Sequence, residues 1–304
     1  MLAARERGMT VEDAPADRYL ARLRRVVEHI EAHPGEELGV ARLAGVAALS
    51  ACHFHRQFSA LFGIGVARYV QLLRLKRATH QLAYRRSMSV LDVALDNGYT
   101  APEAFARALR RHIGQSPREF RDGPDWKSLD TALQPLDNMR SRNMTTPWQI
   151  TDVQVVEFPL TRVAVLAHRG DPQRLGDSIR RFIDWRRRNA LPPQASATYN
   201  LFHDDPQDCD PREFRLDLCA ATAADIAPNP EGVVAGVIPA GRCALLRITG
   251  PDALLDPAAR FLYGEWLPQS GEEPRDFPFF LRRVTFFPEV PEAQAVSELF
   301  LPLR

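Results

Sequence analysis

Two stretches of the chain repeat one pattern: LAGVAALSACHFHRQFSALFG at residues 43–63 and VALDNGYTAPEAFARALRRHIG at residues 93–114. Each begins with a short apolar segment, passes through a turn, and continues as a longer amphipathic segment that ends at a glycine. Beyond the turn the matching positions lie 51 residues apart, with Phe54, Arg56, Phe58 and Gly63 recurring as Phe105, Arg107, Leu109 and Gly114. Before the turn the offset is 50 residues, because one residue is inserted there. The pattern predicts two copies of a short helix, a turn and a second helix.

Helices are also predicted around the two copies. Apolar residues at helical spacing indicate a helix over residues 17–33, which ends at His33-Pro34-Gly35. A long helix over residues 66–84 joins the copies. Ser50 precedes the second helix of the first copy and Ser89 opens the second copy, and both are suited to cap a helix N-terminus. The first third of the chain is therefore expected to be all-α.

The second helix of each copy has one apolar face and one free face. In the first copy, the stripe of Phe54, Phe58 and Leu61 lies opposite Cys52, His55, Arg56 and Ser59. In the second copy, Phe105, Leu109 and Ile113 lie opposite Glu103, Ala106, Arg107 and Arg110. A helix pair of this kind can be a plain αα-hairpin. Two copies with an arginine at equivalent points favour DNA recognition, because a helix fits the major groove and Arg pairs bidentately with guanine.

The charge of the chain is divided unevenly along its length. Residues 17–121 hold 17 Lys and Arg against 9 Asp and Glu, whereas residues 122–304 hold 20 against 26. The basic segment is expected to meet a polyanion, although a charge excess is also typical of a solvated face. Five basic residues near the repeats are candidates either for phosphate contacts or for solvated side chains: Arg74, Lys76, Arg77, Arg110 and Arg111.

The composition of the 304 residues is that of a globular protein with two or three domains, since 45% are hydrophobic and 25% are charged. No apolar run approaches the roughly 18 residues that span a bilayer, and the first residues do not resemble a signal peptide, so a cytoplasmic protein is expected. The cysteines, Cys52, Cys209, Cys219 and Cys243, neither pair closely nor group with histidine. We therefore expect no disulfide, no metal site and no cofactor.

A second internal repeat occupies the other half of the chain, with an offset of 80 residues. Pro159, Arg162, Ala164, Leu166, Gly170 and Leu175 recur as Pro239, Arg242, Ala244, Leu246, Gly250 and Leu255. In each copy the proline is followed by a strand in which apolar and polar residues alternate, a glycine ends this strand, and an amphipathic helix comes next. A further strand, at about residues 214–220 in the first copy and 296–302 in the second, ends each copy. Two equal α+β halves predict a pseudo-twofold domain with a groove between them. The intervening residues 122–150 contain Gly-Pro, Pro135 and Asn138, and are predicted to form a linker, with at most a short helix.

The helical segment resembles the DNA-binding domain of AraC/XylS-family transcription regulators. The resemblance rests on LA…S-x-x-HF-x-R-x-F…G at residues 43–63, GY-x-x-P-E-AF-x-R-x-L at residues 98–109 and G-x-SP-x-x-F-R at residues 114–121. It implies paired helix-turn-helix units that bind double-stranded promoter DNA. By this resemblance, the first recognition helix offers Cys52, His55 and Arg56 to the bases, and the second offers Pro102, Glu103 and Arg107.

The second half resembles the GyrI-like effector-binding domains, and the order of the two parts is Rob-like. The shared motifs are HRG at 168–170, Asp204-Asp205-Pro206, IPAG at 238–241, YGEWLP at 263–268 and the final LFLPL. Relatives often carry a carboxylate after a P-x-F string, whereas Leu281 follows Pro278-Phe279-Phe280 here, so an aromatic or apolar effector is expected rather than a cation. The candidate effector-binding residues, for each of which core packing is the alternative, are Trp185, Tyr199, Phe202, Trp266, Phe279, Phe280 and Leu281.

The sequence thus predicts three segments: an AraC-type DNA-binding domain at 17–121, a linker at 122–150 and a GyrI-like effector-binding domain at 151–304. The predicted function is that of a sequence-specific transcription regulator, not an enzyme. Its expected partners are operator DNA, a small molecule and, as a further candidate, RNA polymerase. One alternative makes the second half a small-molecule hydrolase, since it contains His168, Asp204, Asp205 and Glu265, but no signature unites these as nucleophile, base and orienter. Another alternative makes that half a protein-interaction module.

Overall fold

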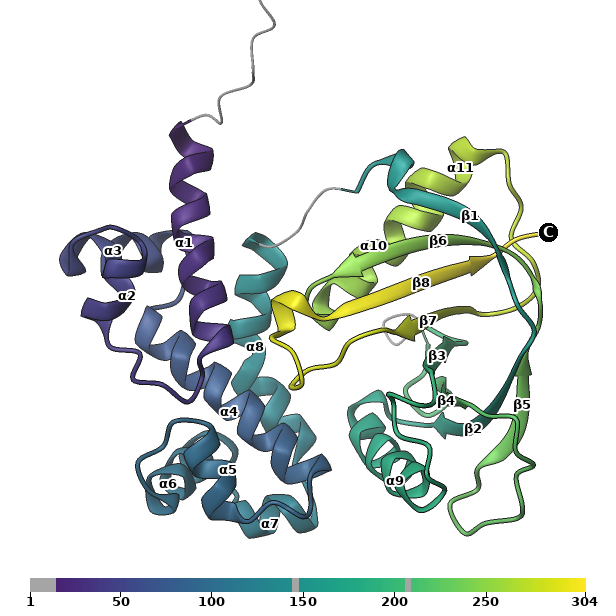
Figure 1. The fold of residues 1–304 in the computed structure, drawn as a ribbon, viewed down its shortest axis with the longest axis horizontal. Coiled ribbons are helices and arrows are strands. Elements are labelled where there is room, and N and C mark those ends of the chain that lie inside the picture. Colours follow the sequence, from purple (N-terminus) through teal and green to yellow (C-terminus); the bar gives the residue numbers. More distant parts are fainter. Residues whose placement is uncertain (1–14, 144–147, 206–208) are drawn as a thin grey trace, which may run out of the picture.

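The structure is a computed structural model that describes residues 15–143, 148–205 and 209–304. Its N-terminal part is built from helices (Figure 1). They are α1 (Pro15–Ala32), α2 (Val40–Val46), α3 (Ala51–Phe62), α4 (Val66–Tyr84), α5 (Val90–Asp96), α6 (Pro102–Ile113), α7 (Pro117–Asp122) and α8 (Trp126–Asn143). The two predicted copies correspond to α2–α3 and α5–α6, and α4 joins them. The all-α prediction for this part is confirmed.

The helices of the two copies begin and end where the sequence predicted. The Ser50 hydroxyl accepts a hydrogen bond from the backbone N–H of His53 (3.4 Å), and Gly63 ends α3 with a φ of 68°. In the second copy, Ser89 and Asp92 form a capping box, and Gly114 ends α6 with a φ of 82°. Glycine adopts this left-handed conformation without the steric cost that a Cβ would add, which is why both helices stop there.

One hydrophobic core joins the helices of the N-terminal part, and it includes α8. The predicted linker therefore contains an 18-residue helix, much longer than a short helix. Its buried side chains are Leu129, Leu133, Leu136 and Met139, and they pack in the same core as Phe58 and Leu109. Their helical spacing is present in the sequence, but Gly123-Pro124 and the internal Pro135 mask it. The α-helical core thus extends at least to residue 139.

The described residues of the C-terminal part form one antiparallel sheet of eight strands. They are β1 (Val153–Phe158), β2 (Thr161–Arg169), β3 (Thr198–Phe202), β4 (Arg215–Ala221), β5 (Val234–Ile238), β6 (Gly241–Thr249), β7 (Phe279–Arg283) and β8 (Val296–Pro302), and a turn η1 (Ile150–Asp152) precedes β1. The strand order is β1-β6-β8-β7-β3-β4-β2-β5. The strands β1, β2, β3 and β4 of the first half correspond to β5, β6, β7 and β8 of the second half. Exchanging each strand for its counterpart reverses the strand order, so a pseudo-twofold axis passes between β3 and β7. The predicted α+β pseudo-twofold fold is confirmed, and each half also contributes its first strand to the edge of the other.

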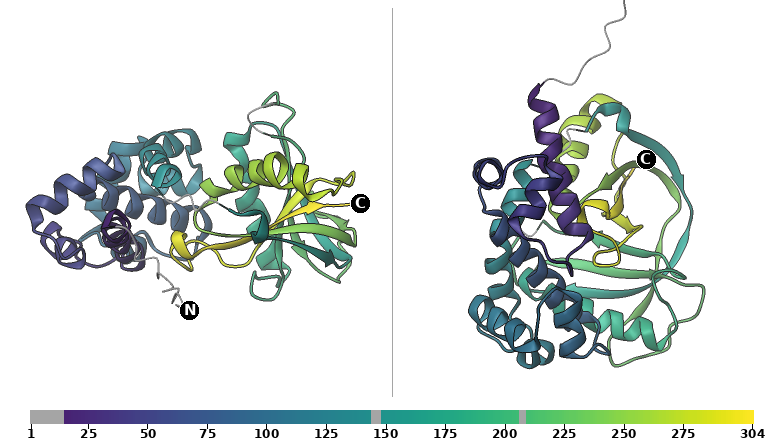
Figure 2. Two further views of the ribbon diagram at one scale, coloured as in Figure 1. Left: turned by 90° about the horizontal axis from the view of Figure 1, so that it is seen from above. Right: turned by 60° about the vertical axis from the view of Figure 1, so that its left-hand side comes forward.

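The two faces of this curled sheet carry different layers (Figure 2). On one face lie α9 (Leu175–Arg188), preceded by the turn η2 (Pro172–Arg174), and α10 (Leu255–Phe261), preceded by the turn η3 (Asp252–Leu254). A π-helical turn, η4 (Leu262–Trp266), connects α10 to α11 (Leu267–Ser270). The other face carries an aromatic cluster that includes Phe158, Tyr199, Phe280 and Phe300. Neighbouring residues of a strand therefore serve different layers, because side chains alternate across the sheet.

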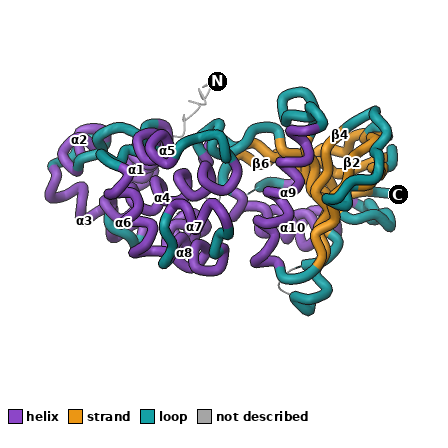
Figure 3. The backbone as a smooth tube through the Cα atoms, turned by 90° about the horizontal axis from the view of Figure 1, so that it is seen from below, coloured by secondary structure: helices purple, strands orange, loops and turns teal. Residues whose placement is uncertain are grey.

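The helical part and the sheet part lie side by side and contact each other (Figure 3). Helix α1 meets the turn η5 (Glu292–Gln294), α4 meets α9, and α8 meets both η2 and η3. Since η2 and η3 are equivalent turns of the two halves, α8 contacts both halves of the pseudo-twofold domain. No single described helix is long and apolar enough to cross a membrane, and α3 and α4 meet that criterion only as a pair bent by 61°.

Candidate functional site

The first predicted recognition helix, α3, exposes the residues that the sequence assigned to DNA. Cys52, His55 and Arg56 are all exposed. On the opposite face of α3, Phe54 and Phe58 are fully buried and their rings meet edge to face, with centroids 5.7 Å apart. Burial of the phenylalanines fixes the rotation of the helix, so Arg56 can only face outward.

The second predicted recognition helix, α6, is oriented in the same way. Glu103 and Arg107 are exposed, whereas Phe105 and Leu109 are fully buried. Pro102 is half-buried and is the first residue of the helix, a position where its missing N–H leaves no helical hydrogen bond unmade. Pro102 therefore starts the helix and contributes little polar chemistry. The six predicted residues form two groups, one on each recognition helix.

Arg74, in the middle of α4, connects the two helix-turn-helix units. Its guanidinium donates to the carbonyls of Pro34 (3.0 Å) and Glu36 (2.6 Å), in the loop before α2, and to the carbonyl of Gly98 (3.1 Å), in the turn before α6. Gly98 has a φ of 71°, and a Cβ there would lie 2.6 Å from Arg74 Nη2. From the sequence, Arg74 was a candidate either for a phosphate contact or for a solvated side chain. Its role could not be found in the sequence, because its partners are backbone carbonyls of distant loops.

Two other phosphate candidates have partners within the protein. The ammonium group of Lys76 lies 2.9 Å from Glu292, and the guanidinium of Arg77 lies 3.3 Å from Asp96. Arg110 and Arg111 are exposed on α6. Arg111 also lines a cleft of about 340 Å³ between α4, α6 and α8, whose lining residues are Arg68, Arg111, His112, Lys127, Ser128, Thr131 and Ala132. Desolvation, and then the neighbouring Arg68, lower the pKa of His112, so the positive charge of the cleft comes from its arginines and lysine.

The seven predicted effector residues are divided between the two faces of the sheet. Tyr199 and Phe280 belong to the aromatic cluster on the face without helices. Trp185 lies on the buried face of α9, stacked on Phe182, and also lines a cleft of about 360 Å³ at the end of that helix. Trp266 and Leu281 are buried in the cluster under α10, and Leu281 is fully buried. The structure therefore places these five residues in three separate groups, and only Trp266 and Leu281 share the cluster against which Phe202 and Phe279 also pack.

Phe202 and Phe279 do lie together, at the boundary between the two halves. They belong to the paired strands β3 and β7, and their rings stack at 4.7 Å with an interplanar angle of 11°. Phe202 packs against both the α9 cluster and the α10 cluster. Tyr263 of η4 lies against Phe279 with ring centroids 6.0 Å apart, and 44% of this tyrosine is exposed. The candidates predicted from the sequence include Trp266 of the same YGEWLP motif but not Tyr263.

Buried carboxylates of the sheet are paired with arginines. Glu298 accepts from Arg282 (2.7 Å) and Arg247 (3.2 Å). Asp217 accepts from Arg215 and lies 2.8 Å from His203 Nε2. Burial alone would raise the pKa of Asp217, but the hydrogen bonds from His203 and Arg215 outweigh it and hold that pKa below its ordinary value. Asp217 is therefore held in its charged form, and both carboxylates already have arginine partners.

Two residues of the hydrolase alternative, His168 and Asp204, form structural hydrogen bonds. His168 is buried at the end of β2, where Nδ1 lies 2.9 Å from Ser178 Oγ and Nε2 lies 3.2 Å from the Asp171 carbonyl. Asp204 accepts the backbone N–H of Arg215 (2.9 Å). Within the described ranges, no group of three or more His, Cys, Asp or Glu side chains is placed to hold a metal ion.

Comparison with known proteins identifies both parts of the chain. Residues 151–304 match the family of GyrI-like small-molecule-binding domains, and residues 43–123 match a helix-turn-helix domain family. The probable transcriptional regulator YgiV of Escherichia coli K12 is 34% identical over 156 residues, which cover 50% of this chain and 96% of YgiV.

Two solved structures are also similar. The DNA-binding domain of AdpA, in complex with a target DNA, is 31% identical and covers 33% of this chain and 90% of its own, with a TM-score of 0.32. A cryo-EM structure of an EcmrR–DNA complex in EcmrR-RPo is 15% identical and covers 84% of this chain and 83% of its own, with a TM-score of 0.43. From its family matches, the chain is a transcription regulator that belongs to the GyrI-like small-molecule-binding family and carries an AraC-type helix-turn-helix domain on its N-terminal side.

Proposed function

We propose that the protein reads an asymmetric promoter operator of about two helical turns through α3 and α6. The observation that carries the proposal is the equivalent exposure of Arg56 and Arg107 on two helices whose opposite faces share one core. Each arginine would pair bidentately with a guanine. Cys52 and His55 precede Arg56 on the same free face of α3, and Glu103 lies one turn before Arg107, where its carboxylate would accept from a cytosine amino group.

A footprinting experiment tests this proposal. The full chain, incubated with DNA that it has selected from a random pool, should protect one asymmetric site of about two helical turns, because one protomer already carries both recognition helices. The protein–DNA complex should contain one protomer, which its mass in solution measures. A palindromic site that only dimers occupy would contradict the proposal.

We further propose that the small-molecule effector is a neutral aromatic or apolar compound that binds over the stacked Phe202 and Phe279. Aromatic side chains that line a site between two halves of a domain favour drug-sized apolar ligands. A cation would need a countercharge to replace its hydration, and the buried carboxylates Asp217 and Glu298 are each already paired with arginine. Leu281 supports the same assignment, because a fully buried leucine stands where relatives often carry a carboxylate.

Calorimetry on the full chain tests the effector class. One aromatic scaffold, prepared in a neutral and a cationic form, should bind more tightly in the neutral form. Phe279→Ala should weaken that binding, whereas Tyr199→Phe, a change on the opposite face of the sheet, should leave it unchanged. Tighter binding of the cation would contradict the effector class, and unaltered binding to Phe279→Ala would contradict the site.

We also propose that the C-terminal domain binds its ligand without converting it. The hydrogen bonds of His168 and Asp204 to neighbouring groups support this, and recovery of the unchanged compound after incubation tests it.

Since the proposed target of the protein is chromosomal DNA, we place the action of the protein in the cytoplasm. RNA polymerase is the further partner that we propose, and a shift of the protein–operator complex by purified polymerase would support it.

A further inference from the structure

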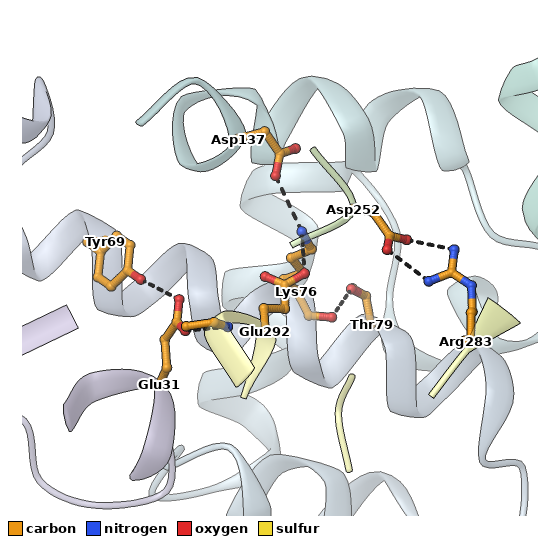
Figure 4. Close-up of polar contacts among 9 residues, drawn as sticks. Glu31, Tyr69, Lys76, Thr79, Asp137, Asp252, Arg283 and Glu292 are labelled. Carbon is orange, nitrogen blue, oxygen red and sulfur yellow. Dashed lines mark hydrogen bonds and ion pairs between the residues drawn. The ribbon is translucent and has the colours of Figure 1, made fainter. Parts of the chain in front are cut away.

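The turn η5 of the C-terminal domain carries a buried carboxylate that pairs with the DNA-binding domain (Figure 4). The side chain of Glu292 is only 8% exposed, and its Oε1 lies 2.9 Å from the ammonium group of Lys76. Lys76 belongs to α4, the helix between the two helix-turn-helix units, and it also lies 3.3 Å from Asp137 of α8. This ion pair joins segments more than two hundred residues apart in sequence.

The next residue of the same turn holds α1. The backbone N–H of Ala293 donates to Glu31 Oε2 (3.1 Å), while the Tyr69 hydroxyl of α4 donates to Glu31 Oε1 (2.9 Å). Glu31 is thus shared between the C-terminal turn and α4. The turn η5 therefore fixes α1 and α4 against each other at the side of the first helix-turn-helix unit.

Contacts continue along α4 toward its C-terminal end. The ring of His80 lies between Tyr84 and Phe287, with centroid distances of 4.7 and 5.4 Å. Desolvation is the main reason that the pKa of His80 falls to about 3, so this histidine is neutral and packs as an aromatic ring. The Tyr84 carbonyl accepts from Arg187 of α9, and Trp126 Nε1 of α8 donates to Asp177 (3.0 Å). The C-terminal domain holds α4 from residue 76 to residue 84.

This interface leaves both recognition faces uncovered, since Arg56 and Arg107 are exposed in the docked arrangement. Docking therefore does not cover either arginine. It instead immobilises the helix whose Arg74 also positions the loops of both units.

From these contacts we propose that Glu292 is a positioning residue for operator recognition. Its ion pair with Lys76 fixes α4 against the turn η5, while the neighbouring Ala293 holds α1, and together these contacts set the distance and the helical phase between α3 and α6. The inference rests on the proposed reading of DNA by those two helices. The C-terminal domain would thereby contribute to the spacing between the two recognition helices.

The experiment compares two DNA duplexes, the selected operator and the same operator with one base pair inserted between its halves. The insertion turns one half by about a tenth of a helical turn, so a rigidly held pair of recognition helices should bind it at least about tenfold more weakly. Glu292→Gln preserves the shape of the side chain and removes its charge. In this variant the ratio of the two affinities should fall to about threefold or less, because the two units can then adjust independently. Glu289→Gln, an exposed position in the same loop, is the matched control and should keep the original ratio.

The ratio separates positioning from a loss of folded protein, because a smaller folded fraction weakens binding to both duplexes equally. Lys76→Met should lower the ratio as Glu292→Gln does, and the double variant should add little, since either change breaks the same pair. An unchanged ratio in both single variants, with the selected operator still bound, would overturn the inference while leaving DNA recognition intact. Failure of the unmodified chain to bind any selected DNA would overturn the proposed function, and this inference with it.

Discussion

Replacing Arg74 with methionine should uncouple the two helix-turn-helix units and destabilise the helical domain. Methionine keeps much of the apolar stem and removes the guanidinium, which donates to three backbone carbonyls at 3.0, 3.1 and 2.6 Å. A hydrogen bond from a charged donor contributes roughly 1.5–3 kcal/mol when the groups are buried. The carbonyls of Pro34 and Gly98 are only partly buried and that of Glu36 is exposed, so water replaces part of the loss. We expect a decrease of about 2–4 kcal/mol in the free energy of unfolding.

Urea unfolding of the full chain, followed by far-ultraviolet circular dichroism, measures this loss as a shift of the helical transition to lower urea. Arg42→Met is the matched control, because Arg42 forms an exposed ion pair with the side chain of Glu36 and its loss should cost less than about 0.5 kcal/mol. If Arg74→Met shifted the transition no more than Arg42→Met, the connection between the units through Arg74 would be refuted.

Three further predictions concern Gly98, the buried Leu281 and the basic charge of the helical domain. Gly98→Ala should destabilise the helical domain by at least about 1 kcal/mol, because alanine is strained in the left-handed backbone conformation of Gly98 and its Cβ would lie 2.6 Å from Arg74 Nη2. The same urea transition measures this loss, and an unchanged transition would contradict the close approach of Gly98 to Arg74. Leu281→Glu should destabilise the C-terminal domain by about 3 kcal/mol or more at neutral pH, because burial raises the pKa of the new carboxyl group. The loss of unfolding free energy should grow as the pH rises above about 4, where the carboxyl group is ionised in the unfolded chain. Thermal unfolding at several pH values measures this loss, and a loss independent of pH would contradict the burial of a charge. Operator affinity should fall by about a thousandfold or more between about 50 and 200 mM salt if six or more phosphates are neutralised, and a flat response in a filter-binding assay would show that the basic charge does not contact phosphate.

The helical domain could be predicted from the sequence because its signals are local. Ser50, Ser89, Gly63 and Gly114 each act within a few residues, and the apolar stripes fix which face of α3 and α6 is free. The length of α8 could not be predicted in the same way. Pro135 and Gly123-Pro124 are local breakers, and only packing of Leu129 and its neighbours against the rest of the core overrides them.

The effector site was only partly predictable. Phe279, Phe280 and Leu281 are consecutive residues of β7, so alternation along a strand prevents them from lining one surface. That argument was available in the sequence once the strand was recognised. The placement of Phe202 beside Phe279 was not, because it depends on the pairing of β3 with β7 across the pseudo-twofold axis. The contact of Glu292 with Lys76 likewise depends on docking of the two domains.

Sequencing of the DNA that is selected from a random pool by the unmodified chain, by Arg56→Ala and by Arg107→Ala tests the central claim most directly. The unmodified chain should select one asymmetric site. Each substitution should relax the choice of base at one position, at a cost of roughly 1–3 kcal/mol, and the two relaxed positions should lie about one helical turn apart. If both substitutions instead weakened binding to every sequence equally, the arginines would contact phosphates, and the assignment of α3 and α6 as the helices that read the bases would be contradicted.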